Sequence, residues 1–159
     1  MNIKQIIVSI SLCGFSAGIG NFPVPVPHIP VHKPKPHLTS LLAILQGASK
    51  KSGLSPRLIA AVVHVESRGK IKVVSSAGAI GPMQLMPTTA NMLGVNPYNV
   101  EQNIIGGSEY LAKLIRQFGN IKKALIAYNE GPTALAQGKV YTQSVTYAKN
   151  VIRYESTES

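Results

Sequence analysis

The sequence contains no aspartate. All six of its acidic residues are glutamates, at positions 66, 101, 109, 130, 155 and 158. This absence excludes an aspartate nucleophile, a relay in which aspartate orients a histidine, and any metal site built from several aspartates. Acid–base chemistry by a carboxyl group in this chain must therefore use a glutamate.

The chain is almost as poor in cysteine, because Cys13 is the only one. A single thiol excludes a disulfide framework and a cysteine-based metal site. Three of the four histidines, at positions 28, 32 and 37, lie in a proline-rich stretch, and His64 lies in an apolar segment where a structural role is expected. We expect neither a metal ion nor a cofactor.

Negative charge is scarce overall, since 16 lysines and arginines against six glutamates give a formal net charge of +10. A basic balance implies an anionic partner, which can be nucleic acid, an anionic membrane surface or an anionic polymer. The basic residues are scattered along the chain and are not interleaved with aromatic residues. This pattern argues against nucleic acid.

The first 38 residues divide into two segments with different compositions. Residues 1–20 combine Lys4, a short apolar run and later small residues, which is typical of a cleavable export signal. The apolar run is too short and too rich in serine and glycine to predict a stable membrane span. Residues 21–38 contain prolines at 23, 25, 27, 30, 34 and 36, which predicts an extended spacer or, as the alternative, a docking arm for a partner. The segment from residue 39 to 155 is the expected folded domain, and residues 156–159 form a short tail.

Apolar periodicity predicts a mainly α-helical domain with no long strand. Capping residues, prolines and glycines place the ends of the segments. We expect a loop or small hairpin over residues 70–81, a single helical turn over 83–85, and helices over residues 39–53, 56–69, 87–93, 100–118, 121–129 and 141–154.

Glu66 stands near the end of the apolar helix that begins at Pro56. Apolar surroundings disfavour the charged form of a carboxyl group and raise its pKa. A glutamic acid that stays protonated near neutral pH can act as a general acid. The alternative is a surface glutamate at a frayed helix end, and spacing alone leaves both possibilities open.

Four motifs in order identify a family resemblance. They are Glu66-Ser67, the segment SSAGAIGPMQLMP at 75–87, Asn103-Ile104 with Gly107 and Tyr110-Leu111, and Ala127-Tyr128-Asn129 with Gly131-Pro132. Together they resemble the soluble-type lytic transglycosylases, glycoside hydrolase family 23, over residues 39–154. The resemblance implies a mainly α, goose-lysozyme-like single domain that is exported to the periplasm and is monomeric. The short length resembles small members that serve secretion or conjugation machines, so such an apparatus is a further expected partner.

The resemblance implies cleavage of the β-1,4 bond between N-acetylmuramic acid and N-acetylglucosamine in peptidoglycan, with a 1,6-anhydro product. Ordinary glycosidases need two carboxyl groups. One glutamate suffices if it first protonates the leaving oxygen and then takes the proton of the sugar's own C6 hydroxyl, while the substrate's acetamido group stabilises the cation. The alternatives are a hydrolysing muramidase of the same fold and a non-catalytic peptidoglycan-binding adaptor of a secretion machine.

Matched to the family motifs, Glu66 is the catalytic acid and base. Ser75 and Tyr128 match positions that hydrogen-bond near the catalytic carboxyl group or the reacting sugar. Loop capping is the alternative for Ser75, and core packing is the alternative for Tyr128.

The other matched positions are assigned to substrate binding. Met83 and Gln84 match groove positions that contact sugar, with core packing and helix capping as their alternatives. Asn129 matches a position that holds the turn at Tyr128. Tyr147 belongs to the closing helix and is also assigned to the substrate site.

Three positions depart from the family pattern. Glu130 stands where a small residue is commoner, so it is either a second carboxylate at the groove or a surface residue. Pro82 replaces a leucine and restricts the backbone before Met83. Gln143 stands where many relatives carry glutamate, which weakens the case for substrate contacts from the helix that contains Tyr147.

Overall fold

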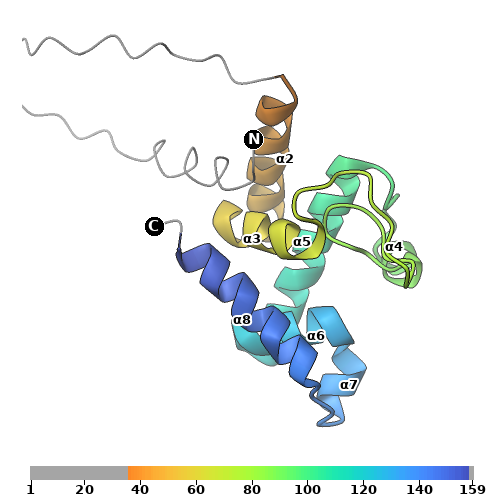
Figure 1. Cartoon of the computed structure of the whole chain (residues 1–159), viewed down its shortest axis with the longest axis vertical. Helices are drawn as coiled ribbons and strands as arrows, with labels where there is room; N and C mark the ends of the chain where they lie inside the picture. The colour runs from red at the N-terminus through yellow and green to blue at the C-terminus, as the bar shows by residue number, and fades with distance from the viewer. Residues whose placement is uncertain (1–35, 158–159) are drawn as a thin grey trace, which may run out of the picture.

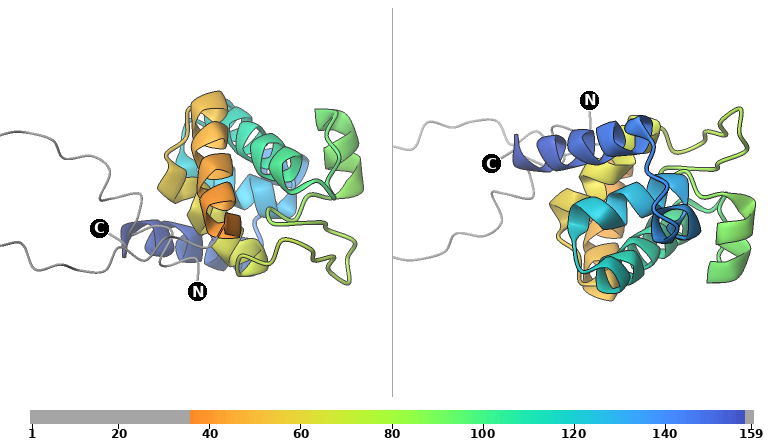
Figure 2. Two further views of the ribbon diagram at one scale, coloured as in Figure 1. Left: turned by 90° about the horizontal axis from the view of Figure 1, so that it is seen from above. Right: turned by 90° about the horizontal axis from the view of Figure 1, so that it is seen from below.

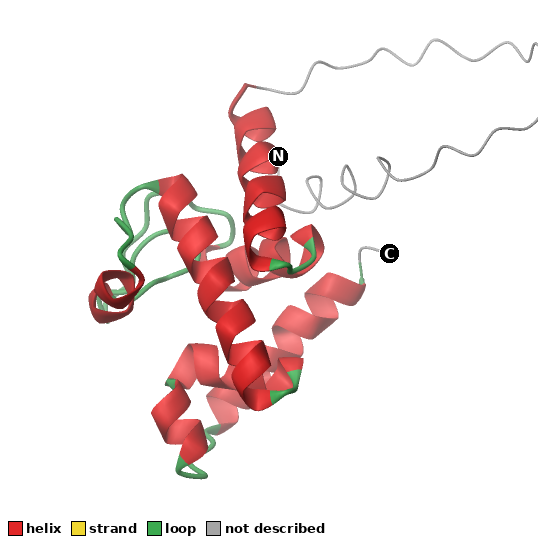
Figure 3. Cartoon of the chain, turned by 180° about the vertical axis from the view of Figure 1, so that it is seen from behind, coloured by secondary structure: helices red, strands yellow, loops and turns green. Residues whose placement is uncertain are grey.

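The computed structural model describes residues 36–157, which form helices joined by loops (Figures 1 and 3). The expected export signal, most of the spacer and the end of the tail lie outside the described residues. Within the described part no β-strand occurs apart from isolated bridges. The helices are α2 (Pro36–Ser52), α3 (Pro56–Ser67), α4 (Pro87–Leu93), α5 (Val100–Phe118), α6 (Ile121–Glu130), α7 (Pro132–Ala136) and α8 (Thr142–Ser156).

Side-chain caps explain why several helices begin where the sequence predicts. The Ser55 hydroxyl accepts a hydrogen bond from the Leu58 backbone N–H at 3.1 Å, and Pro56 follows as the first helical residue. The Asn99 side chain accepts from the Gln102 N–H at 3.0 Å at the start of α5. Such caps satisfy N–H groups that have no partner inside the helix.

Helix α2 begins earlier than the sequence indicates. The expected start was Thr39 or Ser40, after a spacer reaching residue 38, whereas the helix begins at Pro36. Proline is favourable at the first helical position, where its missing N–H is not needed. The predicted end is confirmed, because Gly53 follows the helix with a φ of 75°.

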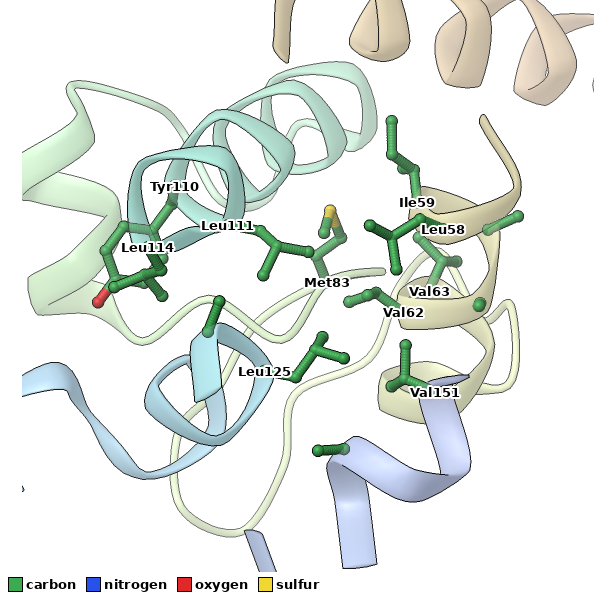
Figure 4. Close-up of a cluster of buried hydrophobic side chains, with 14 of the residues drawn as sticks. Leu58, Ile59, Val62, Val63, Met83, Tyr110, Leu111, Leu114, Leu125 and Val151 are labelled. Atoms are coloured by element: carbon green, nitrogen blue, oxygen red, sulfur yellow. The ribbon is translucent and has the colours of Figure 1, made fainter. Parts of the chain in front are cut away.

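Helix α3 is the centre of the core and is surrounded by the other long helices. Its residues 58–63 are all buried. Figure 4 shows Val62 and Val63 of α3 facing Met83, with Leu111 of α5 on the other side of the methionine. Helix α3 packs against α2, α5 and α8, and α8 also packs along α6. This packing fixes the end of α3, which carries Glu66.

The segment between α3 and α5, together with α4, projects from the helical body to one side (Figures 1 and 2). Isolated antiparallel bridges join Val74 to Ile80 and Ile80 to Leu85, so the expected small hairpin region is present. The prediction of a helical turn over residues 83–85 is wrong. Residues 81–84 form a turn in which Gln84 has a φ of 48°, a conformation that a helix does not contain.

Asn103 on α5 binds the segment between α3 and α5 through three hydrogen bonds. Its side chain is fully buried. Its Oδ1 accepts from the Met83 N–H at 2.9 Å, and its Nδ2 donates to the carbonyl groups of Ile80 at 2.8 Å and Pro97 at 2.9 Å. A Cβ at Gly81 would lie 2.5 Å from Nδ2 of Asn103, and the φ of Gly81 is 77°. Glycine is therefore required beside this amide.

The chain after α6 differs in part from the prediction. Gly131-Pro132 was expected only to end a helix, but Pro132 begins the short helix α7 (Pro132–Ala136). Helix α8 then starts at Thr142 and runs to Ser156, close to the predicted limits of 141 and 154. The short length of α7 explains why apolar periodicity did not reveal it.

Candidate active site

Glu66 is the penultimate residue of α3 and is partly buried. The helix ends because Arg68 adopts the left-handed conformation with a φ of 54°, and the Arg68 N–H donates to the His64 carbonyl at 2.8 Å. The sequence predicted this end one residue later, at Gly69. The buried Ser67 hydroxyl donates to the Val63 carbonyl at 2.9 Å. The last turn is thus well ordered, which excludes the alternative of a glutamate at a frayed end.

The carboxyl group of Glu66 receives a hydrogen bond from Tyr147 on α8. The Tyr147 hydroxyl donates to Oε1 of Glu66 at 2.7 Å, and only 8% of Tyr147 is exposed. Burial raises the pKa of Glu66 from 4.5 to about 7, against a smaller lowering by the Tyr147 hydrogen bond. The predicted direction of this shift is confirmed, so the group can hold or release a proton near neutral pH.

Two further tyrosines lie on the inner side of this carboxyl group. The Tyr128 hydroxyl donates to the Met83 carbonyl at 2.9 Å. Burial, followed by the negative charge of Glu66, raises the pKa of Tyr128 well above its usual value. The ring of Tyr110 lies 5.6 Å from that of Tyr128, at 47°. Tyr128 therefore stays neutral near Glu66, and its hydroxyl proton is already donated to the Met83 carbonyl.

An open groove of about 790 Å³ runs along the exposed face of α8. It is lined by Tyr141, Thr142, Gln143, Thr146, Tyr147 and Asn150. Glu66 does not line this groove itself, but Tyr147 does, and the hydrogen bond from Tyr147 places the carboxyl group directly behind the lining. The lining consists of hydroxyl and amide side chains and two aromatic rings, which suits a neutral, hydroxyl-rich chain such as a glycan.

The loop residues assigned to the site occupy positions that stabilise the loop. The Ser75 hydroxyl accepts from the Ala79 N–H at 3.0 Å. The Gln84 side chain donates to the Gly81 carbonyl at 2.8 Å. Met83 is fully buried, which agrees with core packing, the alternative to sugar contact. Substrate contacts by these three residues stay predictions.

Asn129 and Glu130 end α6 beside the start of α8. Asn129 is exposed, and its role in holding the Tyr128 turn stays a prediction. Oε2 of Glu130 accepts from the Tyr141 N–H at 3.2 Å, and Tyr141 is the residue that precedes α8. Glu130 is thus partly buried at the junction of two helices and does not line the groove, although its Oε1 is buried without a hydrogen-bond partner. It is therefore not a free surface residue, and its part in the chemistry is decided by experiment.

We expect Glu130→Ala to leave the reaction product unchanged and to lower turnover by no more than a few-fold. The lost hydrogen bond loosens the start of α8 and should cost about 1 kcal/mol of stability. Turnover on purified cell wall and the melting temperature measure the two effects. A loss of activity as large as that of a Glu66 variant would show that Glu130 takes part in the chemistry.

The sequence prediction missed three features of the site. Asn103 and Tyr110 were seen only as motif positions, although the first anchors the loop and the second packs on Tyr128. The hydrogen bond from the Tyr147 hydroxyl to Glu66 was not foreseen, and the substrate contact assigned to Tyr147 stays a prediction. Asn103 is a polar residue on the buried face of an amphipathic helix, and that pattern could have indicated a buried hydrogen-bonding role.

Within residues 36–157, no group of three or more histidine, cysteine, aspartate or glutamate residues is placed to hold a metal ion. In the same part of the chain, no helix is long and apolar enough to span a membrane.

The comparisons with known proteins agree with the geometry. The transglycosylase SLT domain model matches residues 43–151. A transglycosylase of Enterobacteria phage PRD1 is 47% identical over 85 residues, covering 53% of this chain and 32% of the phage protein. The membrane-bound lytic murein transglycosylase F of Thiobacillus denitrificans is 33% identical over 115 residues, covering 67% of this chain and 24% of that protein. The chain thus spans a third or less of the length of these relatives.

Solved structures show the same fold. A lytic transglycosylase Slt from Pseudomonas aeruginosa matches with a TM-score of 0.63 and 27% identity, covering 73% of this chain and 23% of that one, and the variant solved there carries a glutamate-to-glutamine change and is described as inactive. The 70-kDa soluble lytic transglycosylase of Escherichia coli matches with a TM-score of 0.62 and 26% identity, again covering 73% and 23%. The expected mainly α, lysozyme-like fold is therefore confirmed. The family model covers well over half of the chain, and the chain belongs to the transglycosylase SLT domain family.

Proposed function

We propose that this protein is a peptidoglycan lytic transglycosylase, which cleaves the β-1,4 bond between N-acetylmuramic acid and N-acetylglucosamine and leaves 1,6-anhydro ends. The observation that carries the proposal is a single carboxyl group with a pKa of about 7, which accepts a hydrogen bond from Tyr147, a residue that lines a polar groove. Family membership supplies the substrate class.

In the first step, protonated Glu66 gives its proton to the bridging oxygen while the bond from C1 of N-acetylmuramic acid to that oxygen breaks. The pKa near 7 suits this step, because about half of the molecules hold the proton at neutral pH and can still transfer it. The substrate's own acetamido oxygen stabilises the positive charge at C1. The leaving sugar departs with a free hydroxyl group.

In the second step, Glu66 is a carboxylate and accepts the proton of the C6 hydroxyl group. The C6 oxygen then bonds to C1 of the same sugar and closes the 1,6-anhydro ring. The proton balance returns Glu66 to its starting form, and no water enters. Ordinary glycosidases use two carboxyl groups; here Glu130 is engaged at the start of α8, and no aspartate exists to replace it.

Tyr147 positions this acid and adjusts its pKa. In the wild-type protein the hydrogen bond from Tyr147 stabilises the charged carboxylate and lowers the pKa of Glu66. Tyr147→Phe removes this bond, so we expect the variant to have a higher pKa at Glu66. The general acid is lost as pH rises through this pKa, so the alkaline limb of the pH–rate profile should move to higher pH. Turnover at the optimum should fall about tenfold as the carboxyl group loses its fixed orientation.

The matched control is Tyr128→Phe, which removes a hydroxyl group that bonds to Met83 instead of Glu66. This variant should melt earlier but keep an alkaline limb near the wild-type value. An alkaline limb that stays in place or moves to lower pH in Tyr147→Phe would contradict the role given to Tyr147.

Digestion of purified peptidoglycan sacculi tests the proposed activity. A lytic transglycosylase releases soluble fragments with anhydro ends, a muramidase releases fragments with reducing ends, and a binding adaptor releases nothing. Mass spectrometry separates these results. Reducing ends alone, or undigested sacculi with bound protein, would contradict the proposal.

The proposal includes export to the periplasm, where this substrate lies, through the signal predicted in residues 1–20. It also includes substrate contacts by Ser75, Met83, Gln84, Tyr128, Asn129 and Tyr147, and a link through the proline-rich residues 21–38 to a secretion or conjugation apparatus. These parts rest on the sequence patterns and the family motifs.

A further inference from the structure

A second hollow lies on the segment between α3 and α5, apart from the groove along α8. It measures about 330 Å³, and its lining includes Ile71, Val74, Ile80 and Tyr98. None of its lining residues lines the groove. Three large apolar side chains are exposed here, with 47% of Ile71, 56% of Val74 and 70% of Tyr98 accessible to water. Exposed apolar side chains that gather at one hollow indicate a surface that another segment covers.

The backbone at Val74 forms an open edge beside this hollow. Two hydrogen bonds of 2.8 Å flank the bridge between Val74 and Ile80 without using the backbone groups of either residue. Ile80 exchanges two hydrogen bonds of 2.9 Å with Leu85 on its other side. In an antiparallel pair of this kind, the N–H and carbonyl groups of Val74 point away from Ile80. Within residues 36–157 no bridge forms on that outer side, so Val74 offers a donor and an acceptor to a further strand.

The proline-rich segment before α2 has the sequence pattern that an edge strand requires. The sequence FPVPVPH at residues 22–28 has proline at every second position. In a strand, the N–H groups of every second residue point to the same side. Proline is tolerated only where its nitrogen faces away from the neighbouring strand. The residues between the prolines can therefore donate to one edge, while the prolines close the other edge to further pairing.

The same pattern supplies an apolar face for the hollow. Residues at every second position of a strand share one face, so Phe22, Val24 and Val26 lie on the face opposite the prolines. Directly opposite residues of an antiparallel pair have their side chains on the same side of the sheet, and Val74 lines the hollow. A valine paired with Val74 therefore covers the hollow beside Tyr98.

The connection to the folded domain is long enough for this contact. Helices α2 and α5 pack against each other and both begin towards the upper end of the body in Figure 1, and Tyr98 comes two residues before α5. Packed helices lie about 8–10 Å apart. The chain from Val26 to Pro36, ten residues further on, spans up to about 30 Å when extended. A segment tethered within reach has a high effective concentration, which favours it over the same segment of a second copy.

We propose that residues 22–28 add to the Val74 edge as an antiparallel strand of the same chain and cover the hollow. Val24 or Val26 pairs with Val74, and the apolar face of the segment shields Ile71 and Tyr98 from water. The inference goes beyond the proposed function and does not depend on it, because the hollow and the groove share no residue.

Amide hydrogen exchange at Val74, measured on the full-length chain, tests the proposal. The variant Val24→Pro/Val26→Pro removes both N–H groups that face the edge and keeps the segment extended. Exchange of the Val74 N–H should become about tenfold faster than in the wild-type protein, because proline at these positions cannot pair with it. The control Ile29→Pro/Val31→Pro makes the same kind of change between the paired residues and α2, and it should leave the rate unchanged.

A second pair of variants tests the hollow from its own side. Tyr98→Ser removes an exposed ring from the lining and should also speed exchange at Val74, whereas Met92→Ser removes an exposed apolar side chain outside the hollow and should not. Equal exchange rates at Val74 in the wild-type protein and in both proline variants would overturn the proposal. Protection of Val74 that disappears on dilution would overturn it as well, because the segment of a second copy would then occupy the hollow. The measurement needs no catalytic activity, so failure of the proposed function leaves this test intact.

Discussion

Glu66→Gln is expected to abolish cleavage of peptidoglycan while leaving the fold intact. The glutamine keeps the shape of the side chain and can still accept the hydrogen bond from Tyr147, but it has no proton to give. Loss of general acid catalysis alone costs about 10²–10⁴-fold in rate. The loss here should exceed that range, because the same group is also the base of the second step.

The stability of the same variant provides an independent check. The pKa of Glu66 is about 7 in the folded chain and 4.5 in the reference state. The folded protein therefore holds the proton more tightly, and its stability falls as pH rises from the lower value through the higher one. The difference corresponds to a loss on the order of 3 kcal/mol in the wild-type protein.

Glutamine cannot ionise, so Glu66→Gln avoids this loss. The variant should melt several degrees above the wild-type protein at about pH 8, and the two should melt close together at about pH 4. Thermal melts followed by circular dichroism at both pH values give the comparison. A folded variant with near wild-type turnover, or one that melts lower at alkaline pH, would be incompatible with a buried catalytic acid at position 66.

The second large effect is expected for Asn103→Ala. The substitution leaves the Met83 N–H and the carbonyl groups of Ile80 and Pro97 without their amide partner. Buried groups left without partners cost about 1–3 kcal/mol each. We expect a loss of stability of about 3 kcal/mol or more, which lowers the melting temperature by about 10 °C. Turnover on peptidoglycan should fall as well. The loop that Asn103 anchors also carries the Met83 carbonyl group, to which the Tyr128 hydroxyl donates.

Asn99→Ala is the matched control for this prediction. It makes the same chemical change just before the same helix, but Asn99 is exposed and only caps α5. Loss of such a cap costs about 1 kcal/mol. Equal melting temperatures for the two variants would show that the Asn103 amide does not anchor the loop.

The sequence was informative wherever the chain's own local chemistry decides the structure. Ser55-Pro56, Asn99 and Gly119 mark helix ends by capping and by a left-handed backbone, and the predicted limits of α5 match the observed ones. These helix ends depend on neighbours within one helical turn. The position of Glu66 at the end of an apolar helix indicated a raised pKa as one of two possibilities, and the burial that decides between them comes from the packing of other helices on α3.

Features that depend on distant contacts were not predictable in the same way. Tyr147 reaches Glu66 across 81 positions of sequence, and periodicity alone cannot show that α8 packs on α3. The turn at residues 81–84 replaces the expected helical turn because Ile80 and Leu85 exchange backbone hydrogen bonds of 2.9 Å across it, and Asn103 on α5 holds the Met83 N–H from outside the turn. The pairing of Glu130 with the Tyr141 N–H likewise appears only once α6 and α8 are placed together.

The most direct test of the central claim is to digest sacculi in water enriched in oxygen-18 and to measure the masses of the released fragments by mass spectrometry. If Glu66 takes its second proton from the sugar's own C6 hydroxyl, the ends are lighter by one water than reducing ends and carry no heavy oxygen. The wild-type protein should give these ends, and Glu66→Gln should give none. Reducing ends that carry one heavy oxygen would contradict the account, because they would show that water and not the C6 hydroxyl attacks the sugar.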